Sequence, residues 1–496
     1  MRIFSHIAYL ILLLLALLFV RAAHAQNTSD QILYAVPNNN DNYTIYTVNV
    51  DDGVKAQIGT VHGDLGMGHD AGWSPDGKFI YLLDSQEPKY PTLTLVDVET
   101  NQRQTIPDSL EGYTCTRPFL WSNTGKWLTY STHSDSQILL KLFNPSNGDI
   151  QTVATLQSSV YPLSELGWSA NLRWSYDDRY LSYDDYKDNT SYTTIYDVQN
   201  QRTVDVPSGS WSPTENKLAY SRNDHTVIYN FVDSTKQQYK ADRIGEWSPD
   251  GRFLTIYQVD KDERETISVI DIRANKIISF EGDITGLDSD SEVVWSSDGR
   301  YLAVTTRNED TGRRRVYILD VVKRSVQDTN IETGNYPPLI WSAEGHQLAF
   351  ISDYVPSEFG GDYTSLWLFD MDHQQSNHYA IKIYSDYWYK SFDWFADGRY
   401  MTVRTDGKTM LLDITSKQFS LIGNSVQSNE LAYWWINKEG TEIALGEYSS
   451  STHDIYLFTP KDKLLKNITN TPDEEKTFLG WRGSKRLNSL IFCGEG

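Results

Sequence analysis

Alternating acidic residues form the first group of side chains that could do chemistry. Asp288, Asp290 and Glu292 are separated by single serines, and such spacing of oxygen ligands is typical of calcium-binding loops. The stretch lacks the central glycine and the distant bidentate glutamate of an EF-hand. Two interpretations therefore stay open, a weak calcium site and an ordinary polar loop, and no other cofactor is expected.

A histidine beside a carboxylate, at His69-Asp70, forms the second group. No second histidine is spaced to complete a metal site with it, so a solvated or hydrogen-bonded histidine is the simpler interpretation. A Gly-x-Ser-x-Gly nucleophile is also missing, because Gly167-Trp168-Ser169 and Gly423-Asn424-Ser425 lack the closing glycine. We therefore predict no catalytic residue of this type.

A repeated phrase that opens with tryptophan must position these groups. Its cleanest copies are Trp73-Ser74-Pro75-Asp76-Gly77 and Trp247-Ser248-Pro249-Asp250-Gly251, each followed by a basic residue and an aromatic one. Self-similarity at a period of roughly 45 residues is typical of solenoids, propellers and arrays. The tryptophans of the repeat are Trp73, Trp121, Trp174, Trp211, Trp247, Trp295, Trp341, Trp394, Trp435 and Trp481.

Inside a unit the apolar period is two, as in strands. Ser-Pro-Asp-Gly is a turn, since proline fixes φ, aspartate bonds its own backbone and glycine takes the positive φ that ends the turn. A β-branched and aromatic strand follows it, and a later apolar strand closes with aspartate, as in Val269-Ile270-Asp271. Each unit therefore contains about four antiparallel strands, and we predict an all-β propeller of about eight to ten blades. The recurring aspartates and glycines are interpreted as structural.

The two ends of the chain indicate how this ring closes. The chain begins with what we interpret as second, third and fourth strands, at 32–36, 44–48 and 55–58, and ends with a first strand at 478–481. A C-terminal strand that completes the N-terminal blade would remove the exposed edges of the ring. We predict a single ring, with one or two decayed or separately stacked units as the alternative.

The Trp-Ser-Pro-Asp-Gly-(Lys/Arg)-aromatic phrase resembles the propeller repeat of TolB, which also occurs in the N-terminal domains of dipeptidyl-peptidase-type and tricorn-type proteases. The resemblance extends over residues 30–496 and is specific for the fold. It implies a periplasmic or extracellular scaffold that contacts proteins or peptides. The protease relatives carry a hydrolase domain beside the propeller, for which this chain shows no nucleophile, so a partner would have to supply one.

Residues just before each first strand belong to the connections between blades, which in a propeller surround one mouth of the channel. Mixed charges and aromatic side chains there suit recognition of a peptide segment or a sugar, with blade packing as the alternative for the aromatics. The candidate ligand-binding residues are His69, Asp70, Arg117, Arg173, Arg243, Tyr336, Tyr387, Trp388 and Tyr389, and Asp290, Glu292, Lys390 and Asp393 lie in the same connections.

The N-terminal segment predicts export. An apolar run over 7–20 precedes the small-x-small sequence Ala23-His24-Ala25, so we expect a signal peptide at 1–25 and the propeller at 26–496; an uncleaved anchor is the alternative. The net charge of −22 argues against a nucleic-acid partner. Cys115 and Cys493 would be free to pair in an oxidising compartment, and the sequence leaves their pairing open.

These observations predict a secreted or periplasmic, non-enzymatic scaffold that binds a protein or peptide. An enzyme acting on a glycan or small ester through channel carboxylates or a metal is the second hypothesis. A structural component of the cell envelope is the third.

Overall fold

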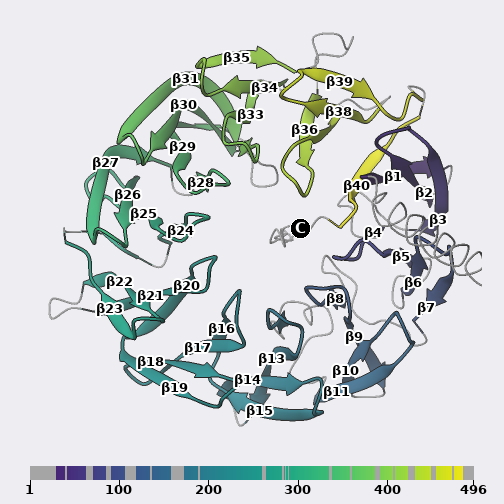
Figure 1. Cartoon of the computed structure of the whole chain (residues 1–496), viewed down its shortest axis with the longest axis horizontal. Helices are drawn as coiled ribbons and strands as arrows, with labels where there is room; N and C mark the ends of the chain where they lie inside the picture. Colours follow the sequence, from purple (N-terminus) through teal and green to yellow (C-terminus); the bar gives the residue numbers. More distant parts are fainter. Residues whose placement is uncertain are drawn as a thin grey trace, which may run out of the picture.

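The structure is a ring of ten four-stranded antiparallel sheets (Figure 1), which confirms the predicted all-β propeller at the upper end of the expected blade number. The computed structural model describes residues 30–38, 42–62, 71–84, 91–106, 119–134, 137–157, 172–187, 190–259, 264–281, 284, 286–288, 290–334, 338–357, 360–385, 391–405, 408–422, 431–447, 454–471 and 474–483. The predicted signal peptide, Cys115 and Cys493 lie outside these ranges. In the described ranges, no helix has the length and apolarity to cross a membrane.

The first five blades after the N-terminal strands run from the innermost to the outermost strand as follows. They are β4–β7 (Ala71–Trp73, Phe79–Asp84, Thr92–Asp97, Arg103–Thr105), β8–β11 (Phe119–Trp121, Leu128–Ser134, Gln137–Phe143, Ile150–Gln157), β12–β15 (Arg173–Trp174, Tyr180–Lys187, Thr190–Asp197, Arg202–Val206), β16–β19 (Gly209–Trp211, Lys217–Arg222, His225–Asn230, Lys236–Lys240) and β20–β23 (Arg243–Trp247, Phe253–Val259, Glu265–Asp271, Lys276–Ile278).

The remaining blades continue around the ring in chain order. They are β24–β27 (Val293–Trp295, Tyr301–Arg307, Arg314–Asp320, Ser325–Thr333), β28–β31 (Ile340–Trp341, Gln347–Ser357, Gly360–Asp370, Gln375–Ser385), β32–β35 (Phe392–Trp394, Tyr400–Thr405, Lys408–Asp413, Gln418–Leu421), β36–β39 (Leu431–Ile436, Ile443–Glu447, Tyr456–Thr459, Leu464–Asn467), and a last blade of β40 (Thr477–Trp481), β1 (Gln31–Asn38), β2 (Asn42–Asn49) and β3 (Lys55–His62).

The ring closes as predicted, by strand pairing between the two ends of the chain. β40 pairs antiparallel with β1, and Ile32 lies opposite Trp481. The Arg482 backbone N–H donates to the Gln31 carbonyl at 2.8 Å, and its side-chain Nε donates to the Gly77 carbonyl of the next blade at 2.9 Å. Ring closure therefore involves both hydrogen bonding within the last blade and a contact across its boundary.

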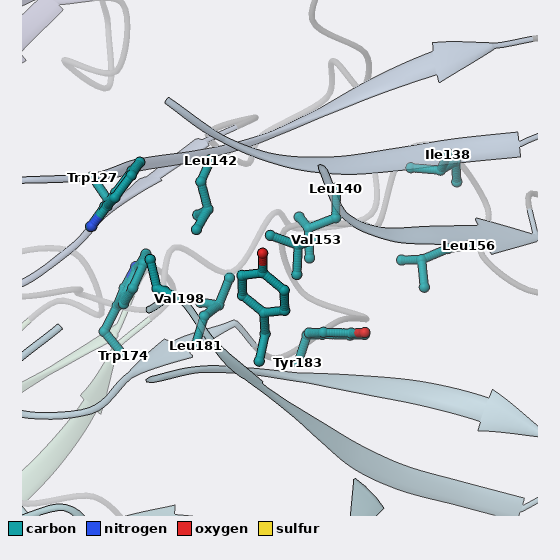
Figure 2. Packing of buried hydrophobic residues seen from close by; sticks show 11 residues of the cluster. Trp127, Ile138, Leu140, Leu142, Val153, Leu156, Trp174, Leu181, Tyr183 and Val198 are labelled. Atoms are coloured by element: carbon teal, nitrogen blue, oxygen red, sulfur yellow. The ribbon is translucent and has the colours of Figure 1, made fainter. Parts of the chain in front are cut away.

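Apolar side chains fill the space between successive blades. Second strands such as β5 and β25 are buried on both faces, because each blade packs against a neighbour on either side. Figure 2 shows one such cluster, in which Trp127 and Leu142 of one blade meet Trp174, Leu181 and Tyr183 of the next. The core is thus divided among the blade interfaces.

Most tryptophans of the repeat also tie one blade to the preceding one. The indole N–H donates to a backbone carbonyl of the neighbouring first strand in the pairs Trp73–Gly480, Trp247–Ser210, Trp295–Glu246, Trp341–Val294, Trp394–Ile340 and Trp481–Trp435, at 2.8 to 3.3 Å. In β36 the residue at the repeat position is not the tryptophan that the sequence predicts but the residue after it. Ile436 lies opposite Ile443, as Trp247 lies opposite Leu254, so Ile436 holds the repeat position and Trp435 precedes it.

Candidate functional site

The ring has two chemically different faces. Every first strand is preceded by the connection from the previous blade and followed by the turn into the second strand, so all connections lie on one face and all these turns on the other. We name them the connection face and the turn face. The turns span five or six residues, as at 74–78 and 122–127, whereas the connections range from two residues, at 207–208, to fifteen, at 158–172.

The polar side chains of the turns form hydrogen bonds within the same turn. Ser248 Oγ donates to Asp250 Oδ1 at 2.6 Å and accepts from the Phe253 N–H at 2.8 Å. Gly251 takes a φ of 67°, a conformation in which a side chain is strained. The same hydroxyl–carboxylate bond recurs between Ser74 and Asp76 and between Ser296 and Asp298.

Turns of successive blades are also bonded to one another. Asn216 Nδ2 donates to Asp177 Oδ2 at 2.8 Å, Thr214 Oγ1 donates to the Asp250 carbonyl at 3.2 Å, and Ser297 Oγ donates to the Ser342 carbonyl at 3.1 Å. These bonds place the turn-face aspartates in structural roles, as the sequence predicts.

The aspartates that close the third strands are engaged in the same way. Partial burial works against ionisation of Asp271, but the hydrogen bond from Arg252 at 3.0 Å, the Arg252 charge and the backbone N–H groups of Arg273 and Ala274 together outweigh it, so the pKa of Asp271 lies below its usual value. Arg300 and Asp320 form the equivalent pair at 3.0 Å in the next blade. The carboxylates that close the third strands are therefore structural partners of arginines in their own blades.

Two of the predicted ligand-binding residues lie in the described part of the chain, and they flank one blade. Arg173 begins β12 and Arg243 begins β20, the first strands on either side of β16. Both side chains are exposed. The other candidates, His69, Asp70, Arg117, Tyr336, Tyr387, Trp388 and Tyr389, lie outside the described residues.

Arg243 is held in a fixed orientation although its side chain is 49% exposed. Its Nη2 donates to Glu265 Oε1 at 2.9 Å, and its guanidinium lies 3.7 Å from the centre of the Tyr257 ring. Stacking and a bond on one side leave further guanidinium N–H groups for a ligand carboxylate or carbonyl. Arg173 reaches the next blade, where its Nη1 donates to the Gly209 carbonyl at 3.4 Å.

The blade between these arginines has the shortest segments on the connection face. Two-residue connections, 207–208 and 241–242, border it on both sides, and its second and third strands are joined by residues 223–224. By contrast, β29, β30 and β31 each have eleven residues. The connections on either side of β16–β19 are therefore the shortest of the ring, at two residues each.

The acidic stretch of the predicted calcium site surrounds a cation of this chain. Arg314 is only 4% exposed, and its Nη1 donates to Asp288 Oδ1 at 2.6 Å, while its Nη2 lies 3.6 Å from Asp290 Oδ2. Although partial burial opposes it, this contact lowers the pKa of Asp288. Calcium would have to compete with the guanidinium, and the described residues contain no group of three His, Cys, Asp or Glu side chains placed to hold a metal.

Sequence reasoning missed Arg314, Tyr257 and Glu265 as partners of the candidate residues. Arg314 lies in a run of three arginines, and only its side chain is buried among them. Strand parity does not single out Arg314, because β26 is buried on both faces: Val316 on the same side and Leu319 on the other are both 0% exposed.

Glu292 differs from the other acidic residues of the stretch. Burial raises the pKa of Glu292 to about 7, although the nearby Arg314 acts in the opposite direction. Its backbone is fixed by two bonds to Thr305, each of 2.9 Å. A carboxyl group with such a pKa can donate or accept a proton near neutral pH.

No family model matches the chain, and no curated protein matches it. Among solved structures, the chain is similar to a eukaryotic initiation factor, with a TM-score of 0.51, 13% identity and coverage of 92% of this chain and 99% of that one. It is also similar to dipeptidyl peptidase 4 of Porphyromonas gingivalis (TM-score 0.41, 12% identity, 81% of this chain and 59% of that one). A third similar structure is TolB of Acinetobacter baumannii (TM-score 0.25, 14% identity, 70% and 79%). At these identities the similarity concerns the propeller fold alone.

Proposed function

We propose that the protein is a secreted or periplasmic, non-enzymatic propeller that binds a protein or peptide partner through its connection face. The contrast between the two faces carries this proposal. Turn-face polar groups are used in bonds such as Ser248–Asp250 and Asn216–Asp177, whereas the connections vary in length from blade to blade. Connections of varied length on a rigid scaffold are the usual place for binding residues.

Within that face, the short connections beside β16–β19 leave most room for an extended segment of a partner to reach the axis of the ring. Arg173 and Arg243 stand on the blades on either side of it, and guanidinium groups bind carboxylates and carbonyls through directed hydrogen bonds. The candidates outside the described residues, including the aromatic run Tyr387-Trp388-Tyr389, would add contact area from other connections.

The experiment is affinity capture of the full chain from its own envelope fraction, followed by binding measurements with the captured partner. We expect the double substitution Arg173→Gln with Arg243→Gln to weaken binding at least tenfold, and Trp388→Ala with Tyr389→Ala to weaken it without unfolding the chain. The matched control is Arg202→Gln with Arg273→Gln, which removes two exposed arginines outside the first strands. Equal affinity in all three variants would remove the connection face as the binding surface.

Glu292 favours a second hypothesis, an enzyme that acts on a glycan or a small ester. Its pKa of about 7 would suit a general acid or base, and turnover would then depend on pH around neutrality and be lost in Glu292→Gln. Metal analysis and turnover assays with and without chelator test the metal-dependent form of this hypothesis, which includes calcium. Resistance to heat and proteolysis with neither turnover nor a captured partner would instead support a structural component of the envelope.

A further inference from the structure

One backbone carbonyl normally joins two blades near the axis of the ring. In β20 the Glu246 carbonyl accepts from Trp295 Nε1 of the next blade at 3.2 Å and from Thr255 Oγ1 of its own blade at 3.0 Å. The hydroxyl and the indole thus converge on a single acceptor. In β12–β15 the same kinds of group are joined in another way, since Trp211 Nε1 donates to Ser182 Oγ at 3.0 Å and Ser182 Oγ donates to the Arg173 carbonyl at 3.2 Å. A hydroxyl and an indole at these positions are therefore expected to be hydrogen-bonded.

The blade β8–β11 has the residues but not the bonds. Thr129 follows Trp121 by the same interval as Thr255 follows Trp247, and the strand registers agree, since Trp121 lies opposite Leu128 as Trp247 lies opposite Leu254. Yet the Thr129 hydroxyl is buried without a hydrogen-bond partner, as are the indole nitrogens of Trp121 and Trp174. Tryptophan bonds to a neighbouring blade are therefore missing at both boundaries of this blade.

Polar contacts that do cross these two boundaries include several at the turn face. Asp178 accepts from the backbone N–H groups of Asn123 and Thr124 at 2.7 and 2.9 Å. Asp178 has a φ of 60° in the turn position that Gly251 holds in β20–β23, so its carboxylate replaces the usual glycine and forms a link between blades. On the other side, Gln104 Nε2 donates to the Pro145 carbonyl at 2.9 Å, in the turn between β10 and β11.

A regular boundary is joined at both faces. Between β24–β27 and β28–β31, Ser297 Oγ donates to the Ser342 carbonyl in the turns. At the opposite end, Thr333 Oγ1, on the last residue of β27, donates to the Ile351 carbonyl at 2.6 Å. Trp341 bonds to Val294 between them. Rigid blades of this kind serve as the internal reference.

We propose that β8–β11 is the mobile blade of the ring: it pivots on its turn-face contacts and separates from its neighbours toward the connection face. The apolar cluster of Figure 2 loses contacts in the open state. The closed state is therefore the more stable one, and the blade opens only transiently. Unpartnered buried donors lower the cost of that excursion, because each regains a hydrogen bond to water on opening. The proposal does not depend on which partner binds.

Hydrogen exchange of the intact chain tests the motion. The amides of β9 and β10 are bonded inside the blade, and a blade that has lost its packing against both neighbours opens this ladder at lower cost. We therefore expect these amides to exchange at least tenfold faster than those of β25 and β26, with the largest difference toward the connection face. Exchange rates that agree within twofold in the two blades would overturn the proposal.

Two matched substitutions test the cause. Thr255→Val removes a made hydrogen bond and should speed exchange in β20–β24, whereas Thr129→Val removes an unpartnered hydroxyl and should leave exchange in β8–β11 unchanged or slower. Asp178→Asn weakens the pivot and should raise exchange in β9 and β10 further. Equal acceleration by both valine variants, or no effect of Asp178→Asn, would contradict the assignment.

Discussion

The turn face and the connection face lie at opposite ends of the same strands but differ in how regular they are. Turns such as 248–252 keep to five or six residues and reuse similar bonds, because each must fit its own blade and the turn of the next. Connections vary from two to fifteen residues. Regular sequence thus follows from contacts between the turns of successive blades, and variety in length is concentrated in the connections.

Trp247→Ala should break the regular side of this comparison most severely. The indole is 8% exposed and donates to the Ser210 carbonyl at 3.1 Å, so the substitution leaves both a cavity and an unmatched carbonyl. We expect a loss of about 3–5 kcal/mol in the free energy of unfolding, measured by urea unfolding. A loss under about 1 kcal/mol would mean that the tryptophan does not hold the blades together.

A pair of glycine substitutions should separate the two faces directly. Gly251 and Gly312 both have a positive φ, of 67° and 68°, so alanine is strained at each by about 1 kcal/mol. At Gly251 the added Cβ would also clash with Thr214 of the neighbouring turn, whereas at Gly312, between β25 and β26, no atom lies within 4 Å. Gly251→Ala should cost about 2–3 kcal/mol and Gly312→Ala about 1 kcal/mol in urea unfolding. Equal losses of stability in the two variants would contradict the expected clash between neighbouring turns.

Carboxyl groups on the two faces should respond to pH with opposite sign. Burial raises the pKa of Glu292 from 4.5 to about 7, so between these values the folded chain holds a proton that the unfolded chain releases. Stability contributed by this group is therefore present below pH 4.5 and is lost as pH rises through about 7. Glu292→Gln should stabilise the protein by about 2 kcal/mol at pH 8 and hardly at all at pH 4.

Asp271 is the matched control for that pH series. Its pKa is lowered, since Arg252 and the backbone N–H groups of Arg273 and Ala274 together outweigh partial burial. Its contribution to stability is present above the usual aspartate pKa and is lost as pH falls below it. Asp271→Asn should therefore destabilise the protein at neutral pH, with a difference from wild type that shrinks in acid. The same sign of effect at pH 8 for both variants would contradict the assignment.

The sequence predicts the ring well because its information is local and repeated. The phrase Trp247-Ser248-Pro249-Asp250-Gly251 contains the strand end, the turn and the interblade donor together, and most units repeat this local arrangement. Side-chain pairing between segments far apart in the sequence is not local information. The contact of Arg314 with Asp288 therefore could not be predicted from the spacing of the acidic residues. The one-residue shift at Trp435 has a similar origin, since the sequence shows a tryptophan beside Ile436 and only strand register places Ile436 in the repeat position.

The substitution with the smallest expected effect on stability best distinguishes a binding residue from a structural one. Arg243→Gln removes an exposed pair with Glu265, which should cost below about 1 kcal/mol. Arg252→Gln removes the partner of Asp271, whose side chain is only 4% exposed, and should cost about 1–2 kcal/mol because a buried carboxylate loses its cation. If the connection face is the binding surface, the order reverses for partner affinity: Arg243→Gln weakens it and Arg252→Gln does not. The two substitutions have the same chemistry, so only the face on which the arginine lies can reverse the order between urea unfolding and binding titration.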